Sequence, residues 1–138
     1  MGYRLADRVL DIKRKMNVCV DLGSGKGYVT RHLTNHSVEK IYAVELSPTM
    51  LQQCVMPQTE ENIVTEKILY DEDILTSGEQ SLRKLPFEDE SVDIVTSSLA
   101  MHWVNNLPGL FNEVKRILRK DGVFIGSMFG GDTLFEMR

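Results

Sequence analysis

Two hydrophobic patterns alternate along the chain: short continuous apolar runs, and segments whose apolar residues recur every three or four positions. The runs are rich in Val and Ile, which favour strands buried on both faces of a sheet. They predict strands at residues 18–22, 40–45, 65–70, 91–97 and 123–129. The second pattern predicts helices at residues 4–12, 27–35, 48–55 and 107–119.

Strands that alternate with helices indicate an α/β protein, here a Rossmann-like fold with a parallel sheet and helices on both faces. The expected strand order is 3-2-1-4-5. In sheets of this type a ligand binds beyond the carboxyl ends of the strands, where the strand order reverses, between the first and fourth strands. The residues that follow these two strands are therefore the first candidates for a site.

The first strand ends in an acid and is followed by alternating glycines, at Gly23, Gly25 and Gly27. Such glycines let a ligand approach the backbone closely, although a tight turn without a ligand is the alternative. A dinucleotide loop would need a third glycine where Tyr28 stands, which disfavours a nicotinamide dehydrogenase. A phosphate loop would need Lys-Ser or Lys-Thr, and neither follows a glycine here. The remaining pattern, acid-x-G-x-G-x-G, resembles the S-adenosylmethionine loop of class I methyltransferases.

A second signal lies about twenty residues further on, where the strand at residues 40–45 ends at Glu45. A carboxylate at this offset can accept hydrogen bonds from both hydroxyls of a ribose. The two signals together favour a ligand that contains adenosine.

Bulk properties narrow the function further. The chain has 138 residues, the length of one domain, and a net charge of -4 with a pI near 5.4, which does not suggest a nucleic-acid partner. Cys19 lies in a predicted strand and Cys54 in a predicted helix, which indicates two reduced thiols rather than a disulfide. No apolar run reaches transmembrane length, and no targeting segment is visible in the sequence.

Four segments carry a closer resemblance: Leu85-Pro86-Phe87, residues 92–99, residues 102–108 and residues 121–134. They resemble the mitochondrial methyltransferase-like assembly factors of respiratory complex I, and the similarity extends over nearly the whole chain. Bacterial methyltransferases of biotin-precursor synthesis share the general pattern and are the nearest competing family.

The resemblance implies an S-adenosylmethionine-binding protein on the matrix side of the mitochondrial inner membrane, peripherally associated with that membrane. The implied partners are a complex I core subunit or other assembly factors, and the implied activity is hydroxylation of an arginine in a core iron–sulfur subunit. Two alternatives stay open. One is an S-adenosylmethionine-dependent methyltransferase acting on a small molecule or a protein, and the other is a non-catalytic binding module that aids assembly.

The resemblance also assigns roles to single residues. The methionine end of S-adenosylmethionine would be held by the first loop, Asp21, Gly23, Ser24, Gly25 and Gly27, with Ser97 and Ser98 beside it. Glu45 would hold the ribose and Leu46 would flank the adenine. The adenine amino group would meet an acid after the third strand, where Asp71 with Glu72 is favoured and Asp73 is the alternative. His102 and Trp103 would lie at the substrate side.

The chain departs from the family pattern at two places. About ten extra residues separate Asp73 from Leu85. Class I methyltransferase sheets have seven strands, whereas this sequence predicts five, so we expect residues 1–138 to form an incomplete domain without the C-terminal substrate region. Its last strand would then have an exposed apolar edge, which predicts self-association.

No metal site is predicted, because His32 and His36 are one helical turn apart but no carboxylate accompanies them in a known ligand pattern. The catalytic residues are not identified by the sequence. His102 is the only candidate base that the pattern offers, and it is a weak one.

Overall fold

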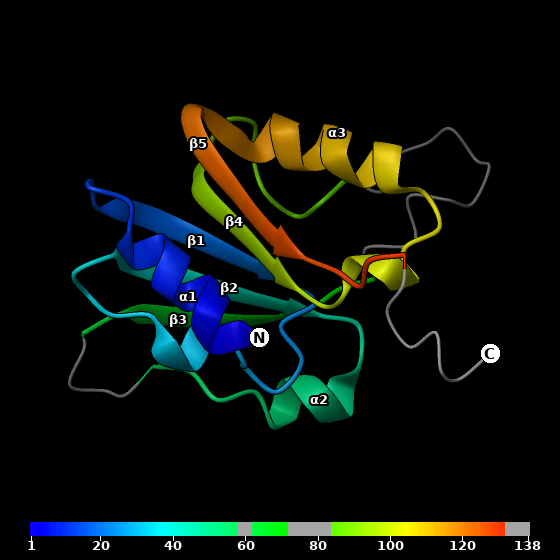
Figure 1. Ribbon diagram of the computed structural model, residues 1–138, viewed down its shortest axis with the longest axis horizontal. Helices are drawn as coiled ribbons and strands as arrows, with labels where there is room; N and C mark the ends of the chain where they lie inside the picture. The colour runs from blue at the N-terminus through cyan, green and yellow to red at the C-terminus, as the bar shows by residue number, and fades with distance from the viewer. Residues whose placement is uncertain (58–61, 72–83, 132–138) are drawn as a thin grey trace.

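The computed structural model describes residues 1–57, 62–71 and 84–131, and in these ranges it forms a five-stranded parallel sheet with helices on both faces (Figure 1). The strands are β1 Met16–Leu22, β2 Val38–Glu45, β3 Val64–Leu69, β4 Val92–Ser98 and β5 Leu118–Ser127. Their order is β3-β2-β1-β4-β5, so the predicted Rossmann-like order is confirmed. All four strand pairs are parallel.

Successive residues of the central strands pack into two separate cores, one on each face of the sheet. Cys19 and Ile94 belong to the core that includes the apolar residues of α1 (Gly2–Leu10), whereas Val20 and Val95 belong to the core that includes those of α3 (Leu107–Ile117). Because neighbouring side chains of a strand point to opposite faces, a continuous apolar run is what a sheet covered on both faces requires. Both cysteines are buried and free, as predicted.

The predicted helix at residues 27–35 is wrong. The segment forms turns and a single 3-10 helix, η1 (Thr30–His32). Gly27 has φ +78°, a left-handed conformation that interrupts an α-helix. The carbonyl of Lys26 accepts hydrogen bonds from the Val55 amide and from the Arg31 side chain, so partners outside a helical ladder satisfy it. The predicted inward positions Val29 and Leu33 are nevertheless buried.

The other helices differ from prediction mainly at their ends. Helix α2 (Pro48–Gln52) begins as expected, with Ser47 as N-cap accepting the Met50 amide at 3.4 Å, but it is short. Helix α3 ends at Ile117 and passes directly into β5, so β5 begins five residues before the predicted start. None of the helices in the described ranges has the length and apolarity needed to cross a bilayer.

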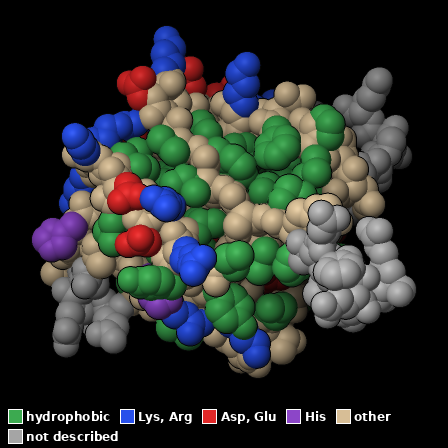
Figure 2. Space-filling view, viewed as in Figure 1, with side chains coloured by type: hydrophobic (Ala, Val, Ile, Leu, Met, Phe, Trp, Pro, Cys, Tyr) green, Lys and Arg blue, Asp and Glu red, His purple; other side chains and the backbone are tan. Residues whose placement is uncertain are grey.

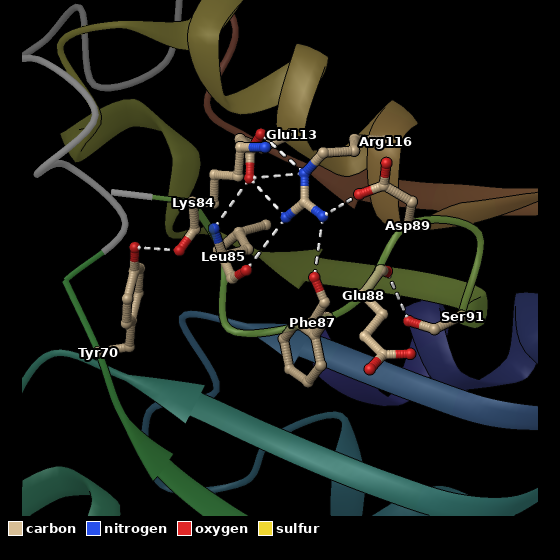
Figure 3. Close-up of polar contacts among 9 residues, drawn as sticks. All are labelled: Tyr70, Lys84, Leu85, Phe87, Glu88, Asp89, Ser91, Glu113 and Arg116. Carbon is tan, nitrogen blue, oxygen red and sulfur yellow. Dashed lines mark hydrogen bonds and ion pairs between the residues drawn. The ribbon is translucent and has the colours of Figure 1, made fainter. Parts of the chain in front are cut away.

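Arg116 of α3 fastens the helix to the segment that enters β4 (Figure 3). Its guanidinium donates to Glu113 and Asp89 and to the carbonyls of Leu85 and Phe87, at 2.7–3.1 Å. Glu113 also accepts the Leu85 amide at 2.9 Å. Burial acts to raise the pKa of Glu113, but the hydrogen bonds from Arg116 and Leu85 outweigh it and lower the pKa. This cluster links α3 to the segment that leads into β4.

Candidate functional site

A cavity of about 520 Å³ lies at the carboxyl ends of β1, β2 and β4. This volume is within the range of small-molecule sites, roughly 300–1,000 Å³. The residues that line it come from the start of α1, the loop after β1, the end of β2, α2 and the segment after β4: Met1, Gly2, Gly23, Gly25, Tyr28, Glu45, Leu46, Met50, Ser98, Leu99, Ala100 and Trp103. The cavity therefore occupies the place that the strand order predicts for a ligand.

The glycine loop is tied to the end of β2 through Glu45. One carboxylate oxygen of Glu45 accepts the Gly25 amide at 2.9 Å, and the other accepts the Ser47 amide at 2.9 Å. Gly25 has φ +55°, and a Cβ built on it would lie 3.4 Å from the terminal methyl carbon of Met50. The two sequence signals, twenty residues apart, thus meet directly in the cavity wall.

The second half of the loop is held from outside the cavity. A Cβ on Gly27 would lie 2.1 Å from the Val55 carbonyl oxygen, so this position needs a glycine for close packing as well as for its φ of +78°. Arg31 donates to the Lys26 and Gly27 carbonyls, and its guanidinium lies 5.3 Å from the centroid of the Tyr28 ring. Tyr28, half-exposed, forms one wall of the cavity.

Asp21 is buried beneath the loop. One of its oxygens accepts the Thr96 hydroxyl at 2.7 Å, and the other has no hydrogen-bond partner among the described residues. The pKa of Asp21 is raised to about 7, because burial and, to a smaller extent, the charge of Glu45 outweigh the hydrogen bond from Thr96, which lowers it. A buried carboxyl group with an unsatisfied oxygen is an acceptor held ready for a donor that reaches the base of the loop.

The structure brings together four of the residues predicted to bind the cofactor and separates others from the cavity. Gly23, Gly25, Glu45 and Leu46 line the cavity. Asp21, Ser24 and Ser97 are buried beneath the lining, Gly27 packs against Val55, and half-buried Asp71 is not among the lining residues. Glu72 and Asp73 lie outside the described residues. Of the two serines expected beside the methionine end, Ser98 lines the cavity and Ser97 does not.

Several lining residues had no sequence signal as ligand contacts. Tyr28 stood out only because it is not a glycine, and Met50 reads as an ordinary helix residue. Leu99 adopts φ +55°, which few residues other than glycine adopt and which the sequence does not indicate. The strained turn lies directly after β4, where functional segments of this fold are found.

His102 and Trp103 lie in the 3-10 helix η4 (Met101–Trp103), and of the two Trp103 lines the cavity whereas His102 does not. The His102 ring lies 5.0 Å from the Trp103 ring and 5.0 Å from the Phe129 ring, centroid to centroid, and its Nδ1 is buried without a partner among the described residues. Across residues 1–57, 62–71 and 84–131, no three or more His, Cys, Asp or Glu side chains are grouped so that they could hold a metal ion.

Comparison with known proteins gives the family context of this site. A family model described as a methyltransferase domain matches residues 20–126, which include the end of β1, the glycine loop, Glu45 and β4. The mouse (Mus musculus) protein named arginine-hydroxylase NDUFAF5, mitochondrial, is 41% identical over 138 residues. The match covers all of this chain and 36% of that protein, so the chain spans about a third of the length of this curated relative.

Two further matches come from bacteria. A malonyl-[acyl-carrier protein] O-methyltransferase of Nitrosospira multiformis is 32% identical over 148 residues, covering 98% of this chain and 46% of that protein. The crystal structure of an S-adenosylmethionine-dependent methyltransferase from Mesorhizobium loti superposes with a TM-score of 0.67 at 28% identity, covering 91% of this chain and 52% of that one.

Proposed function

The chain belongs to the methyltransferase-domain family, and on this premise we propose that it binds S-adenosylmethionine in the cavity at the carboxyl ends of β1, β2 and β4. The observation that carries the proposal is the hydrogen bond between the Gly25 amide and Glu45, which unites the glycine loop and the acid of β2 in one wall. A carboxylate in this position suits the ribose of an adenosine ligand, and Tyr28 in place of a third loop glycine disfavours a dinucleotide.

The residues present fit the parts of this cofactor. Glu45 keeps unused lone pairs after accepting two amides, and these can accept the ribose hydroxyls. Leu46, exposed at the cavity wall, offers an apolar surface to adenine, and the unpartnered oxygen of Asp21 suits the ammonium group of the methionine end. When bound, S-adenosylmethionine supplies an activated methyl group on a sulfonium. Transfer of this group needs chiefly positioning and exclusion of water.

The proposed activity of the whole protein rests on its similarity to the named relatives. We propose that the chain is the cofactor-binding part of a mitochondrial assembly factor of respiratory complex I that hydroxylates an arginine of a core iron–sulfur subunit. The support is 41% identity over the full 138 residues to a protein named as a mitochondrial arginine-hydroxylase. On this proposal the protein works on the matrix side of the inner membrane, peripherally attached, and its partners are that core subunit or other assembly factors.

A second candidate function rests on the bacterial relative. The similarity to a malonyl-[acyl-carrier protein] O-methyltransferase extends over 98% of this chain, and the cavity would serve methyl transfer equally well. The third candidate function is that of a non-catalytic module, which binds the cofactor in the same cavity and aids assembly.

Two measurements test these proposals in sequence. Calorimetric titration should show saturable binding of S-adenosylmethionine and none of NADH; no binding by a folded chain would refute the cofactor proposal. Mass spectrometry of an arginine peptide and of malonyl-acyl-carrier protein, each incubated with the protein, S-adenosylmethionine, dioxygen and a reductant, separates the activities. Gain of an oxygen by the peptide supports hydroxylation, gain of a methyl by the carrier protein supports the second candidate, and gain of neither supports the binding module.

We also propose that the chain associates with itself through the free edge of β5, which pairs only with β4 among the described strands. Hydrophobic side chains gather on the face of the molecule over β5 and α3 (Figure 2). A groove of about 420 Å³ between these elements is lined in part by Phe111, Val114, Leu118 and Phe124. Light scattering over a concentration series should show a rising mass, and a monomer at high concentration would refute self-association.

A further inference from the structure

Trp103 is placed in an unusual way for a large apolar side chain. It is the single tryptophan of the sequence, and 78% of its surface is exposed. It nevertheless has a defined position: its amide donates to the Ala100 carbonyl at 3.1 Å within η4, and it lines the proposed cofactor cavity. Large exposed apolar side chains at the edge of a cavity are typical of binding surfaces, because burial of an aromatic ring there adds affinity.

The ring is supported from behind by two others. His102 lies between Trp103 and Phe129, with centroid distances of 5.0 Å to each. His102 follows β4 and Phe129 follows β5, so the row of three rings joins the ends of two neighbouring strands. Among the described residues His102 is the one ring that contacts the indole, and the remaining surface of the indole faces solvent. A flat aromatic surface is thus held at the outer edge of the cavity.

We propose that Trp103 is a specificity-determining residue that stacks against the guanidinium of the substrate arginine. The inference rests on the proposed arginine-directed function and adds to it the group that recognises the side chain. The face of an indole attracts cations more strongly than any other aromatic face in proteins, and a planar guanidinium can stack on it as an ammonium cannot. Glu45 adds a negative charge to the same lining, which favours a cation at the cavity.

The exposure of Trp103 favours a substrate over the cofactor as the stacking partner. The glycine loop and half-buried Glu45 form one wall of the cavity, whereas most of the indole surface is open to solvent. Such an exposed surface is accessible to a side chain of a substrate protein that approaches the cavity from solvent. Stacked there, the guanidinium would be oriented with its planar face against the ring and its edge free to enter the cavity.

Trp103 is also the probe that tests the proposal, because all tryptophan fluorescence of the chain arises from it. A short peptide with one arginine is titrated into the protein saturated with S-adenosylmethionine, and the matched peptide with citrulline, which has the same shape without the charge, serves as control. We expect the arginine peptide to change the emission saturably and the citrulline peptide to bind at least fivefold more weakly. Equal affinity of the two peptides would overturn the proposal.

Variants then separate this inference from the function on which it rests. By calorimetry, Trp103→Leu should weaken the arginine peptide roughly 5- to 30-fold, the range expected from about 1–2 kcal/mol of cation–π attraction, and Trp103→Phe should weaken it less. Leu10→Ala, which truncates another exposed apolar side chain outside the cavity, should bind like the parent chain. The affinity for S-adenosylmethionine, measured for each variant, should change less than the affinity for the peptide.

Two results would count against the inference in different ways. If Trp103→Leu binds the arginine peptide as tightly as the parent chain, Trp103 is not the recognition surface, although the arginine-directed function stands. If the parent chain binds S-adenosylmethionine but not the arginine peptide, the arginine-directed function fails for this chain and the inference fails with it.

Discussion

Replacing Glu45 with alanine tests the cofactor proposal at its most specific point. Each oxygen of Glu45 accepts one backbone amide at 2.9 Å, from Gly25 and from Ser47. A carboxylate has about four acceptor positions, so one on each oxygen remains for the two ribose hydroxyls. Hydrogen bonds to a charged group contribute about 1.5–3 kcal/mol, which predicts a loss of S-adenosylmethionine affinity of roughly 10- to 150-fold in Glu45→Ala.

The same substitution also removes an acceptor from the loop, and this second effect has to be measured separately. Loss of two amide–carboxylate hydrogen bonds at a half-buried position should lower the free energy of unfolding by about 1–3 kcal/mol. Urea denaturation of the free protein gives this quantity. Glu39→Ala is the matched control, because Glu39 lies on the same strand, is exposed, and forms an ion pair only with Lys15 among the described residues. It should change neither affinity nor stability by more than about 0.5 kcal/mol.

A comparison of two ligands isolates the ribose contact. Calorimetry is done with S-adenosylhomocysteine and with its 2′-deoxy analogue, on the parent chain and on Glu45→Ala. If Glu45 accepts the 2′-hydroxyl, the parent chain should prefer the ribose form by about tenfold or more, and the variant should lose this preference. An equal preference in both proteins would refute the ribose role of Glu45, even if the variant binds both ligands weakly.

Three further predictions concern stability. Gly27→Ala should lower the free energy of unfolding by roughly 2–5 kcal/mol, from left-handed strain and overpacking against Val55. Gly130→Ala should leave it unchanged, because among the described residues no atom beyond its chain neighbours lies within 4 Å of the new Cβ; equal urea midpoints for the two variants would contradict this. Arg116→Ala should lower the free energy of unfolding by about 3–5 kcal/mol, because the Arg116 side chain is only 16% exposed and forms ion pairs. Arg8→Ala, whose side chain is 72% exposed, should lower it by less than about 1 kcal/mol. Similar losses in the two variants would refute the stabilising role of the Arg116 cluster. The pKa of Asp21 is raised from 3.8 to about 7, so between these pH values the folded chain keeps a proton that the unfolded chain has lost. The free energy of unfolding should therefore fall as the pH rises from about 4 to 7. Asp21→Asn should flatten this slope, and an unchanged slope would show that Asp21 is not its source.

The sheet could be predicted from the sequence because its determinants are local. Val20 and Cys19 show the pattern directly, since a run without polar alternation has to be buried on both faces, and each residue does belong to a different core. Alternation of such runs with helical segments fixes a parallel sheet through the right-handed crossover. The pairing of the glycine loop with Glu45 could be predicted for the same reason, because the ends of neighbouring parallel strands lie at one edge.

The features that the sequence did not reveal depend on contacts between distant residues. Residues 27–35 have helical spacing, and Val29 and Leu33 are buried as that spacing requires. The segment is not an α-helix because Gly27 adopts φ +78° and the Lys26 carbonyl accepts the amide of the distant Val55, a contact that is not visible in local propensity. The resemblance implied that Trp103 lies at the substrate side, but its place in the cavity lining depends on the turn after β4, whose course no spacing rule specifies.

The glycine loop is held by the protein itself, and this has a consequence for binding. Ser24 donates its amide to the Val44 carbonyl and Gly25 donates to Glu45, while the Lys26 carbonyl accepts from Val55. Every one of these partners lies 20 or more residues further along the chain, at the end of β2 or after α2. The loop conformation is therefore set by the packed sheet, so that little ordering entropy remains to be lost when a ligand binds. Glycine at Gly25 leaves the cavity side of this rigid loop open, whereas glycine at Gly27 lets its other side pack against Val55. One short motif thus has two physical reasons for its glycines, and only the first concerns the ligand.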